Sequence, residues 1–346
     1  MTTLLLSGLT VTAAVCASLT AAVIPLLRRA RVVDVPGDRS LHRTPVPRGG
    51  GLAIVLAASL ATWTAVLAAV HLQGAVHAMS GVDVALMGLA TVLAFALLGL
   101  IEDLFSVSVR ARLVLQLVLG AGLGLVAHSA FEVSLWWTPA ICVGTAALVN
   151  ATNFMDGANG LACGHALLTS LWYVQVAAVA PVAGLGLVMV SVAGACLGFL
   201  PFNTPRAKVF LGDSGSYALG SAWAFAVTAC LSRGVAVEAA LAPVLVLLAD
   251  TGYTLWMRLR AGQCWYAPHR LHVYQRLVCA GWPHWASALL VTLAAAACSA
   301  LAASSLLPSN RLWMPQVAMA AVLIVYLKMP SIIGAPNPFP TLRRAR

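Results

Sequence analysis

The chain has 346 residues, of which 61% are hydrophobic and only 9% are charged, and its formal net charge is +10. Its mean hydropathy of +0.93 excludes an ordinary soluble globular protein, in which about half of the residues are apolar. The positive charge does not require a nucleic-acid partner, because basic residues of membrane proteins collect in the cytoplasmic connections.

Apolar runs of about 20 residues, long enough to cross a bilayer, follow one another along the chain. The first run lacks a basic start and is too long for the core of a signal peptide, so we expect it to remain as a span. The sequence predicts an all-α polytopic membrane protein with a single membrane-embedded domain over residues 1–346. We expect about eleven spans, at residues 3–27, 51–70, 84–101, 112–128, 137–152, 160–179, 182–201, 214–231, 235–257, 285–307 and 313–329.

The basic residues set the orientation of these spans. If the N-terminus lies outside, the inside connections are 28–50, 102–112, 202–213, 258–284 and the tail from 328, and they hold 18 of the 20 Lys and Arg residues. Only Arg233 and Arg311 fall outside. Because positive residues favour the cytoplasmic side, we expect an outside N-terminus and a cytoplasmic C-terminus.

Five polar stretches lie on the inner side of this topology. They are DVPGDRSLHRTPVPRGGG (34–51), GLIEDLFSVSVRARLVLQ (99–116), NATNFMDGANGLA (150–162), RAKVFLGDSGSYALG (206–220) and YAPHRLHVYQRL (266–277). The ordinary alternative is that such loops only set topology, and for 34–51 this alternative is as good as a functional one. The outer connections are short and less polar, so we expect the function to face the cytoplasm.

Four carboxylates adjoin apolar spans at this face: Glu102, Asp103, Asp156 and Asp213. An unpaired carboxylate is costly there and usually marks a functional site. Oxygen ligands without cysteine suit Mg²⁺, and Asn150 and Asn153 share a helix face from which they can add amide groups. Glycines around Asp156 and Asp213 allow sharp turns, and the helices that follow direct N–H groups at an anion. We expect a site for a phosphorylated, metal-bound substrate.

In this order and on these connections, the five stretches resemble the polyprenyl-phosphate N-acetylhexosamine-1-phosphate transferase family. That family includes the translocase that makes lipid I of peptidoglycan and the enzymes that initiate O-antigen synthesis. The match covers about residues 30–280, and the C-terminal spans and basic tail (285–346) lie beyond it. The HRLHVYQR form is more similar to the O-antigen branch. The chain departs from the family pattern at Glu102 in the acidic pair, at Arg110 where lysine is common, and at Asn159, which replaces a second aspartate.

The resemblance implies transfer of an N-acetylhexosamine-1-phosphate from a UDP-sugar to undecaprenyl phosphate, which releases UMP and initiates a surface polysaccharide such as O-antigen. It implies Mg²⁺ as cofactor, with Mn²⁺ as a substitute, and an active site on the cytoplasmic face of the bacterial inner membrane. Expected partners are the two substrates and membrane lipids, without nucleic acid, and a homodimer is an assembly to be tested.

The resemblance also assigns roles to residues. The expected catalytic residues are Asp103, Glu102, Asp156 and Asp213, and the expected metal ligands are Asp213 and Asn153. The expected substrate-binding residues are Asn150, Asn159, Arg110, Lys208, His269, Arg270, His272, Arg39 and His42. A phosphate monoester has a second pKa of about 6, so the acceptor is mostly dianionic at neutral pH and Asp103 would serve more by positioning than as a general base. Direct displacement is preferred, and a covalent route through a carboxylate stays open.

A transporter or flippase is the alternative from another class. Transporters place their polar site near mid-bilayer, and Asp250, inside the predicted span 235–257, is the one acidic residue that suits this function, although its ADTGY context also resembles the family. The other carboxylates lie at span ends, and the two halves show no repeat. A catalytically inactive scaffold is disfavoured because Asp103, Asp156 and Asp213 are all present.

Overall fold

The structure is a computed structural model that describes residues 2–36, 44–73, 75–105, 107–180, 182–267, 269–306 and 313–336. Two of the predicted substrate-binding residues, Arg39 and His42, lie outside these ranges. The helices are α1 (Thr2–Arg29), α2 (Gly51–Gln73), α3 (Ala75–Phe105), α4 (Val109–Phe131), α5 (Thr138–Phe154), α6 (Leu161–Val179), α7 (Leu185–Asn203), α8 (Gly212–Ser232), α9 (Val237–Leu241), α10 (Leu245–Arg260), α11 (Val273–Cys279), α12 (His284–Ala302) and α13 (Met314–Ile332).

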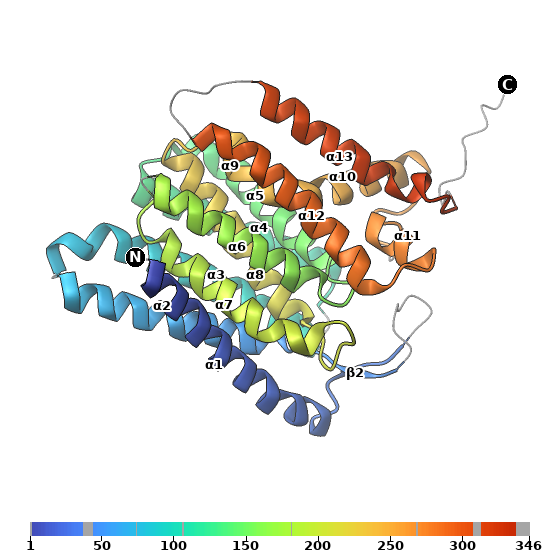
Figure 1. Cartoon of the computed structure of the whole chain (residues 1–346), viewed down its shortest axis with the longest axis horizontal. Helices are drawn as coiled ribbons and strands as arrows, with labels where there is room; N and C mark the ends of the chain where they lie inside the picture. Colours follow the sequence, from blue (N-terminus) through green and yellow to red (C-terminus); the bar gives the residue numbers. More distant parts are fainter. Residues whose placement is uncertain are drawn as a thin grey trace.

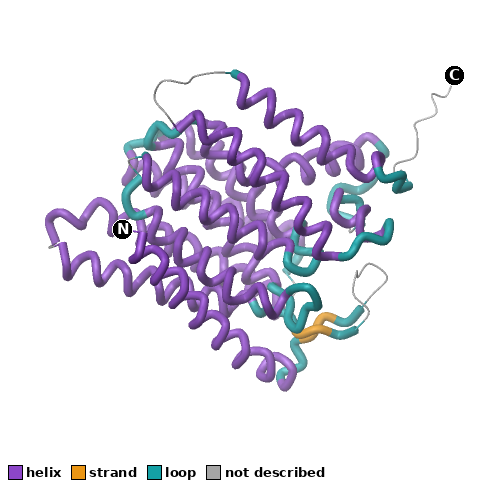
Figure 2. Tube along the Cα trace, in the orientation of Figure 1, coloured by secondary structure: helices purple, strands orange, loops and turns teal. Residues whose placement is uncertain are grey.

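Short 3₁₀ turns and one small hairpin complete the described structure. The 3₁₀ turns are η1 (Leu135–Trp137), η2 (Ala242–Val244) and η3 (Ala303–Leu306). Strands β1 (Val33–Asp34) and β2 (Val46–Pro47) pair antiparallel, with Val33 opposite Pro47 and Asp34 opposite Val46. Helices dominate the tube view in Figure 2, with strands confined to that hairpin.

Nine helical segments of the described chain are long and apolar enough to cross a membrane. The prediction of an all-α polytopic membrane protein is therefore confirmed. The helices α5 and α8 are not among the nine, although they overlap the predicted spans 137–152 and 214–231. Every residue of α8 from Gly212 to Ala226 is buried in the bundle, so this helix does not need the long apolar surface of a lipid-facing span. The orientation of the termini stays a prediction.

Small residues allow α8 to lie close to its neighbours α3 and α5. A Cβ atom added at Gly99 of α3 would overlap the carbonyl oxygen of Asp213, and one at Gly220 of α8 would lie 2.6 Å from the Cα atom of Val149 in α5. Helices in membranes gain van der Waals contact when small residues let their backbones approach. This packing brings the end of α3 and the end of α5 against the first turn of α8.

The predicted span 235–257 is interrupted, because α9 ends at Leu241 and α10 begins at Leu245 after the turn η2. Three buried side chains of α6 donate hydrogen bonds to carbonyl oxygens at this break: His165 to Pro243 at 2.8 Å, Trp172 to Ala239 at 2.9 Å, and Tyr173 to Ala240 at 2.8 Å. Irregular backbone inside a membrane is tolerated where protein groups satisfy it. His165 therefore has a structural role.

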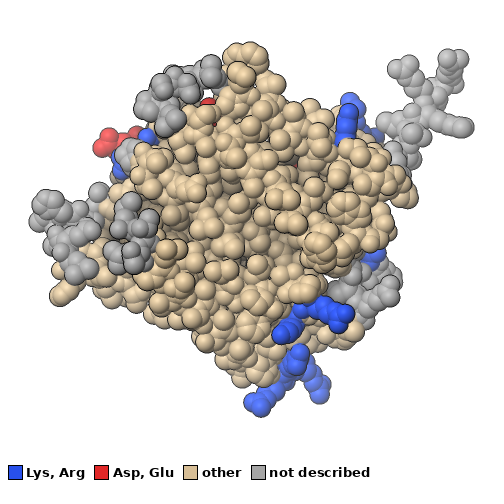
Figure 3. All heavy atoms as spheres, viewed as in Figure 1, with Lys and Arg blue, Asp and Glu red and all other residues tan. Residues whose placement is uncertain are grey.

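The polar stretches gather at one end of the bundle. Figure 1 places the β hairpin and α11 at the right-hand end, opposite the end at which α1 begins. On the face shown in Figure 3, most Lys and Arg side chains also lie towards that end. The ends of α3 and α5 and the start of α8 meet there, so the fold brings distant parts of the sequence to one site.

Candidate active site

Asp103 and the first turn of α8 form the centre of this polar end. The two carboxylate oxygens of Asp103 accept the backbone N–H groups of Asp213 and Ser214, each at 3.0 Å. Such N–H groups have no carbonyl partner within their own helix. The Asp103 side chain is only 3% exposed. Asp103 thus caps α8 from another helix, and both of its oxygens are engaged.

Arg48 links the same two aspartates. Its Nε atom lies 3.0 Å from Oδ1 of Asp103, and its Nη2 atom lies 2.8 Å from Oδ2 of Asp213. Short strand-like pairing fixes its backbone, because Phe210 donates its N–H to the carbonyl of Pro47 at 2.8 Å and Arg48 forms a parallel bridge with Phe210. The Arg48 side chain is 39% exposed, so its positive charge remains accessible from the polar end.

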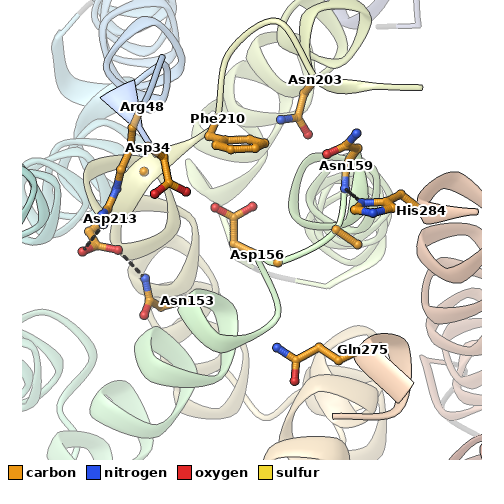
Figure 4. A pocket seen from close by; sticks show the side chains of 13 residues that line it. Asp34, Arg48, Asn153, Asp156, Asn159, Asn203, Phe210, Asp213, Gln275 and His284 are labelled. Carbon is orange, nitrogen blue, oxygen red and sulfur yellow. Dashed lines mark hydrogen bonds and ion pairs between the residues drawn. The ribbon is translucent and has the colours of Figure 1, made fainter. Parts of the chain in front are cut away.

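Asn153, in the last turn of α5, contacts the other oxygen of Asp213. Its Nδ2 atom donates to Oδ1 of Asp213 at 2.6 Å and to Oγ of Ser216 at 3.0 Å. Figure 4 shows the amide nitrogen directed at Asp213 and the amide oxygen directed away. The predicted metal ligands Asn153 and Asp213 are therefore neighbours, but Asn153 would have to turn its amide to offer an oxygen to a cation bound by Asp213.

Asp156 lies in the turn between α5 and α6, and its carboxylate points into a cavity (Figure 4). No donor among the described residues hydrogen-bonds to this carboxylate. Burial raises the pKa of Asp156 well above its ordinary value of 3.8, and the charge of Asp213 raises it further. Ionised Asp156 is therefore a costly group in the ligand-free site, and a bound cation would offset that cost.

The cavity has a volume of about 350 Å³ and two chemically different ends. Arg48, Asp213 and Asn153 line one end, and Asn159, Asn203 and His284 line the other, with Asp156 between them (Figure 4). The ring of Phe210 lies between Asp34 and Asn203 along one wall. The remaining lining residues are Gly157, Ala158, Gly212 and Gln275. A ligand with a charged part and a polar, uncharged part fits this division.

Backbone contacts hold the uncharged end in place. Asn203 accepts the N–H of Gly160 at 2.7 Å and donates to the carbonyl of Val209 at 3.0 Å. Asn159 donates its side-chain amide to the carbonyl of Pro205 at 3.1 Å, and its backbone N–H to Nδ1 of His284 at 3.3 Å. Gly160 has a φ of +80°, a conformation that glycine adopts readily. The loop after α5 is thus tied to α7 and α12.

The cavity offers hard oxygen ligands to a cation. The described residues contain no cluster of three or more His, Cys, Asp or Glu side chains arranged as a metal site. Asp213 and Asp156 nevertheless line one cavity, and Asp156 lacks a hydrogen-bond donor there. Mg²⁺ usually takes one or two protein carboxylates and completes its shell with substrate phosphates and water. This donor set fits Mg²⁺ better than a soft metal.

Two predicted site residues have partners away from the cavity. Glu102 accepts the guanidinium of Arg112 at 3.0 Å and the backbone N–H of Val107 at 2.9 Å. Asn150 donates to Gln116 at 2.5 Å and to the carbonyl of Ala146 at 2.8 Å. Neither residue lines the cavity. Their contacts tie helices together beside the site.

The predicted basic residues also lie outside the cavity lining. Arg110 is exposed on α4, and the ammonium of Lys208 lies 5.8 Å from the ring centre of Phe202. Burial lowers the pKa of His269 to about 4, with a further contribution from His272. His269 is therefore neutral at neutral pH. Arg270 lies in the same loop, and His272, next to α11, is only 2% exposed.

Among the polar and aromatic residues that line the cavity, sequence reasoning did not assign six: Asp34, Arg48, Asn203, Phe210, Gln275 and His284. Four of these belong to the polar stretches, so the sequence around them already indicated a functional site. Asn203 and His284 lie outside all five stretches. Nothing local in the sequence distinguishes these two residues, because they reach the cavity from the end of α7 and the start of α12.

Residues 84–231 match the model of glycosyl transferase family 4. The chain is 31% identical over 307 residues to a decaprenyl-phosphate N-acetylglucosaminephosphotransferase of Mycobacterium leprae, covering 78% of this chain and 75% of the relative. It is 27% identical to a probable undecaprenyl-phosphate N-acetylglucosaminyl 1-phosphate transferase of Bacillus subtilis, covering 78% of this chain and 77% of the relative.

The name of a third relative includes a different sugar. The chain is 33% identical over 235 residues to a phospho-N-acetylmuramoyl-pentapeptide-transferase of Desulforudis audaxviator, covering 57% of this chain and 68% of the relative. The ordered motifs, the helical bundle and the similarity to the mycobacterial protein over 307 residues agree. The chain therefore belongs to glycosyl transferase family 4, the family of polyprenyl-phosphate sugar-1-phosphate transferases.

Proposed function

We propose that this protein transfers an N-acetylhexosamine-1-phosphate from a UDP-sugar to undecaprenyl phosphate, with Mg²⁺ as cofactor and UMP as the second product. The observation that carries the proposal is that Arg48, Asp213, Asn153 and Asp156 line one cavity, at the polar end of a membrane bundle. The names of the relatives support a polyprenyl-phosphate acceptor and an N-acetylglucosamine donor.

The division of the cavity suits a nucleotide-sugar donor. The charged end matches a diphosphate, because Arg48 supplies a guanidinium and the two carboxylates supply cation ligands. The other end offers the amides of Asn159 and Asn203 beside the flat ring of Phe210. Bases bind to proteins by stacking on aromatic rings and by hydrogen bonds to their polar edges. We therefore assign the uridine to this uncharged end and the diphosphate to the Asp213 end.

Asp213 and Asp156 are the residues that would hold Mg²⁺, and Asn153 would join them if its amide turned. A bound divalent ion would neutralise charge that develops on the phosphate oxygens and would orient the diphosphate. Asp103 has a different part. Because its oxygens are engaged by two N–H groups of α8 and by Arg48, we assign to it the positioning of Asp213 and not the abstraction of a proton.

The proposed reaction is a direct displacement at the β-phosphorus. A bond forms between an oxygen of the lipid phosphate and the β-phosphorus, and the bond from the β-phosphorus to the oxygen bridging to the α-phosphate breaks. UMP leaves with that oxygen and its electron pair, and the anomeric bond of the sugar stays intact. The acceptor phosphate has a second pKa of about 6, so no proton needs to be removed. Alignment and charge neutralisation then carry most of the catalysis.

The covalent alternative has a separate test. Direct displacement predicts no exchange of labelled UMP into the UDP-sugar when the lipid acceptor is absent. Fast exchange under that condition would replace direct displacement by a carboxylate–phosphosugar intermediate. We also propose that the cavity faces the cytoplasm of the bacterial inner membrane, where the initiating step of a surface polysaccharide such as O-antigen takes place.

The decisive experiment uses purified full-length protein in detergent. UMP release is measured with undecaprenyl or decaprenyl phosphate as acceptor and with UDP-N-acetylglucosamine, UDP-N-acetylgalactosamine or UDP-N-acetylmuramoyl-pentapeptide as donor. We expect Mg²⁺-dependent release, which Mn²⁺ also supports, with one of the two unmodified N-acetylhexosamine donors. Absence of UMP with every donor and acceptor would contradict the proposed function and would favour the transporter alternative.

A further inference from the structure

Asp250 is a fully buried carboxylate within the membrane-spanning segment Val237–Arg260. Its Oδ1 atom accepts Nδ1–H of His272 at 3.1 Å and the hydroxyl of Thr254 at 3.2 Å. Its Oδ2 atom accepts the backbone N–H of Val273 at 3.0 Å and the hydroxyl of Tyr326 at 2.7 Å. An ionisable side chain inside a membrane is usually paired with another polar group and usually contributes to function. Here four donors surround one carboxylate, which leaves little capacity for a transported solute.

These donors come from three separate parts of the chain. Thr254 belongs to α10 itself, His272 and Val273 lie at the start of α11, and Tyr326 lies in α13. The donors of α11 and α13 therefore converge on α10 at one carboxylate. The helix α11 has only seven residues, and its contacts with Asp250 lie at its start.

The opposite side of α11 faces the candidate active site. Gln275 accepts the backbone N–H of His272 at 3.2 Å, and its side chain lines the cavity. Tyr274 donates its hydroxyl to the carbonyl of Phe154 at 2.9 Å. A Cβ atom added at Gly157 would overlap that hydroxyl, so Tyr274 packs directly against the turn that carries Asp156.

We propose that Asp250 is a positioning residue of the transferase site. Together with Tyr326 it fixes His272 in the tautomer with hydrogen on Nδ1 and sets the position of α11. Through α11 it sets Gln275 in the cavity and Tyr274 beneath the Asp156 turn. A carboxylate that orients an imidazole or a helix behind a site commonly affects activity without touching the substrate. This inference rests on the proposed function only in one respect: the effect of Asp250 on rate is measured with the proposed transfer reaction.

Asparagine cannot replace Asp250 in this arrangement. An ionised carboxylate only accepts hydrogen bonds, whereas an amide has one accepting oxygen and one donating NH₂ group. In Asp250→Asn the NH₂ group would face two of the four donors, so at least one buried pair would be lost. The imidazole of His272 would then avoid an unfavourable contact with the new amide by turning or by carrying its hydrogen on Nε2 instead of Nδ1. Tyr326→Phe is a milder change, because it removes one donor and keeps the ring.

The test compares Asp250→Asn, Tyr326→Phe and wild type as full-length protein in detergent, with rates normalised to folded protein from size-exclusion chromatography. We expect kcat/KM for UDP-N-acetylglucosamine to fall about tenfold or more in Asp250→Asn, with a raised KM, and by a smaller factor in Tyr326→Phe. Asp83→Asn is the matched control, because Asp83 is an exposed aspartate of α3 and does not line the cavity.

A second readout follows His272 directly. In ¹⁵N-histidine NMR spectra, the His272 signal is identified by its loss in His272→Gln. We expect hydrogen on Nδ1 in wild type and a changed tautomer or shift in Asp250→Asn. Wild-type kinetics per folded molecule together with an unchanged His272 signal would overturn the proposal, even if less protein folds. If wild type releases no UMP, the proposed function fails, and the His272 spectra alone decide the positioning role.

Discussion

The backbone N–H of Asp213 donates to the carboxylate of Asp103 at 3.0 Å, across 110 positions of the sequence. The side chain of Asp213 is held from two further directions, by Arg48 at 2.8 Å and by Asn153 at 2.6 Å. The residue proposed to bind Mg²⁺ is thus fixed before any ligand arrives. A preorganised charge of this kind loses little free energy to rearrangement during the reaction.

Removing the cap from α8 should destabilise the protein and impair the reaction. In Asp103→Asn one accepting oxygen is replaced by an NH₂ group that faces N–H donors and Arg48. We expect a loss of about 0.5–2 kcal/mol in the free energy of unfolding, as for other helix caps, and a fall in turnover because Asp213 shifts. Thermal unfolding and UMP release are measured on the same detergent preparation. Glu102→Gln, next in the sequence but outside the cavity, should lose less activity, and the reverse order would contradict this assignment.

Removing the charge of Asp213 should affect turnover far more than folding. Asp213→Asn keeps the size of the side chain, and we expect turnover to fall on the order of a hundredfold or more. Folded yield should change little, because a buried negative charge is costly to hold. UMP release is measured across a magnesium titration, with Asp83→Asn as a nearly silent control. If Asp213→Asn works like wild type at low magnesium, the metal site lies elsewhere.

Asp156→Asn should raise the thermal stability of the ligand-free protein at neutral pH while reducing activity. Burial raises the folded-state pKa of Asp156 above 3.8, so its favourable contribution to stability is fully present below that value. The contribution is lost as pH rises through the folded-state pKa. The gain in melting temperature should therefore be largest near neutral pH and shrink in acid. Melting curves from about pH 4 to pH 8 test this, and an equal or lower melting temperature at neutral pH would refute it.

The polar end should face the cytoplasm. Reporter fusions at residues 75, 205 and 340 are expected to report outside, inside and inside, because 18 of the 20 basic residues lie in the predicted inner connections. Residue 75 is the first residue of α3, whereas the candidate active site lies at the opposite end of this helix, near Asp103. An inside signal at 75 would place the cavity outside the cell.

The sequence could predict that the polar stretches meet. In a chain of successive membrane spans, every second connection lies on the same side of the membrane. Asp103, Asn153, Asp156 and Asp213 indeed come together. Their detailed partners were not predictable. The oxygens of Asp103 accept backbone N–H groups of α8, and Asn150 donates to Gln116. These partners depend on how the helices pack and on the rotation of each helix about its axis. The residues next to Asp103 and Asn150 in the sequence do not indicate how the helices pack.

The fold shows the same limit at the interrupted span. Hydropathy predicts one span over 235–257, and Pro243 alone hints at a break between α9 and α10. The groups that make the break tolerable, His165, Trp172 and Tyr173, come from α6, about seventy positions earlier in the sequence. A polar group in an apolar run can only be assigned this structural role once its partner across the bundle is known.

The central claim is that this protein moves the β-phosphorus of a UDP-sugar onto a polyprenyl phosphate. The most direct measurement uses UDP-N-acetylglucosamine labelled with ³²P at the β-phosphate, together with undecaprenyl phosphate, magnesium and purified wild-type protein. The account predicts that the label enters the solvent-extractable lipid while the released UMP is unlabelled. Label that stays in water-soluble products, or a glycosylated lipid without the label, would contradict it.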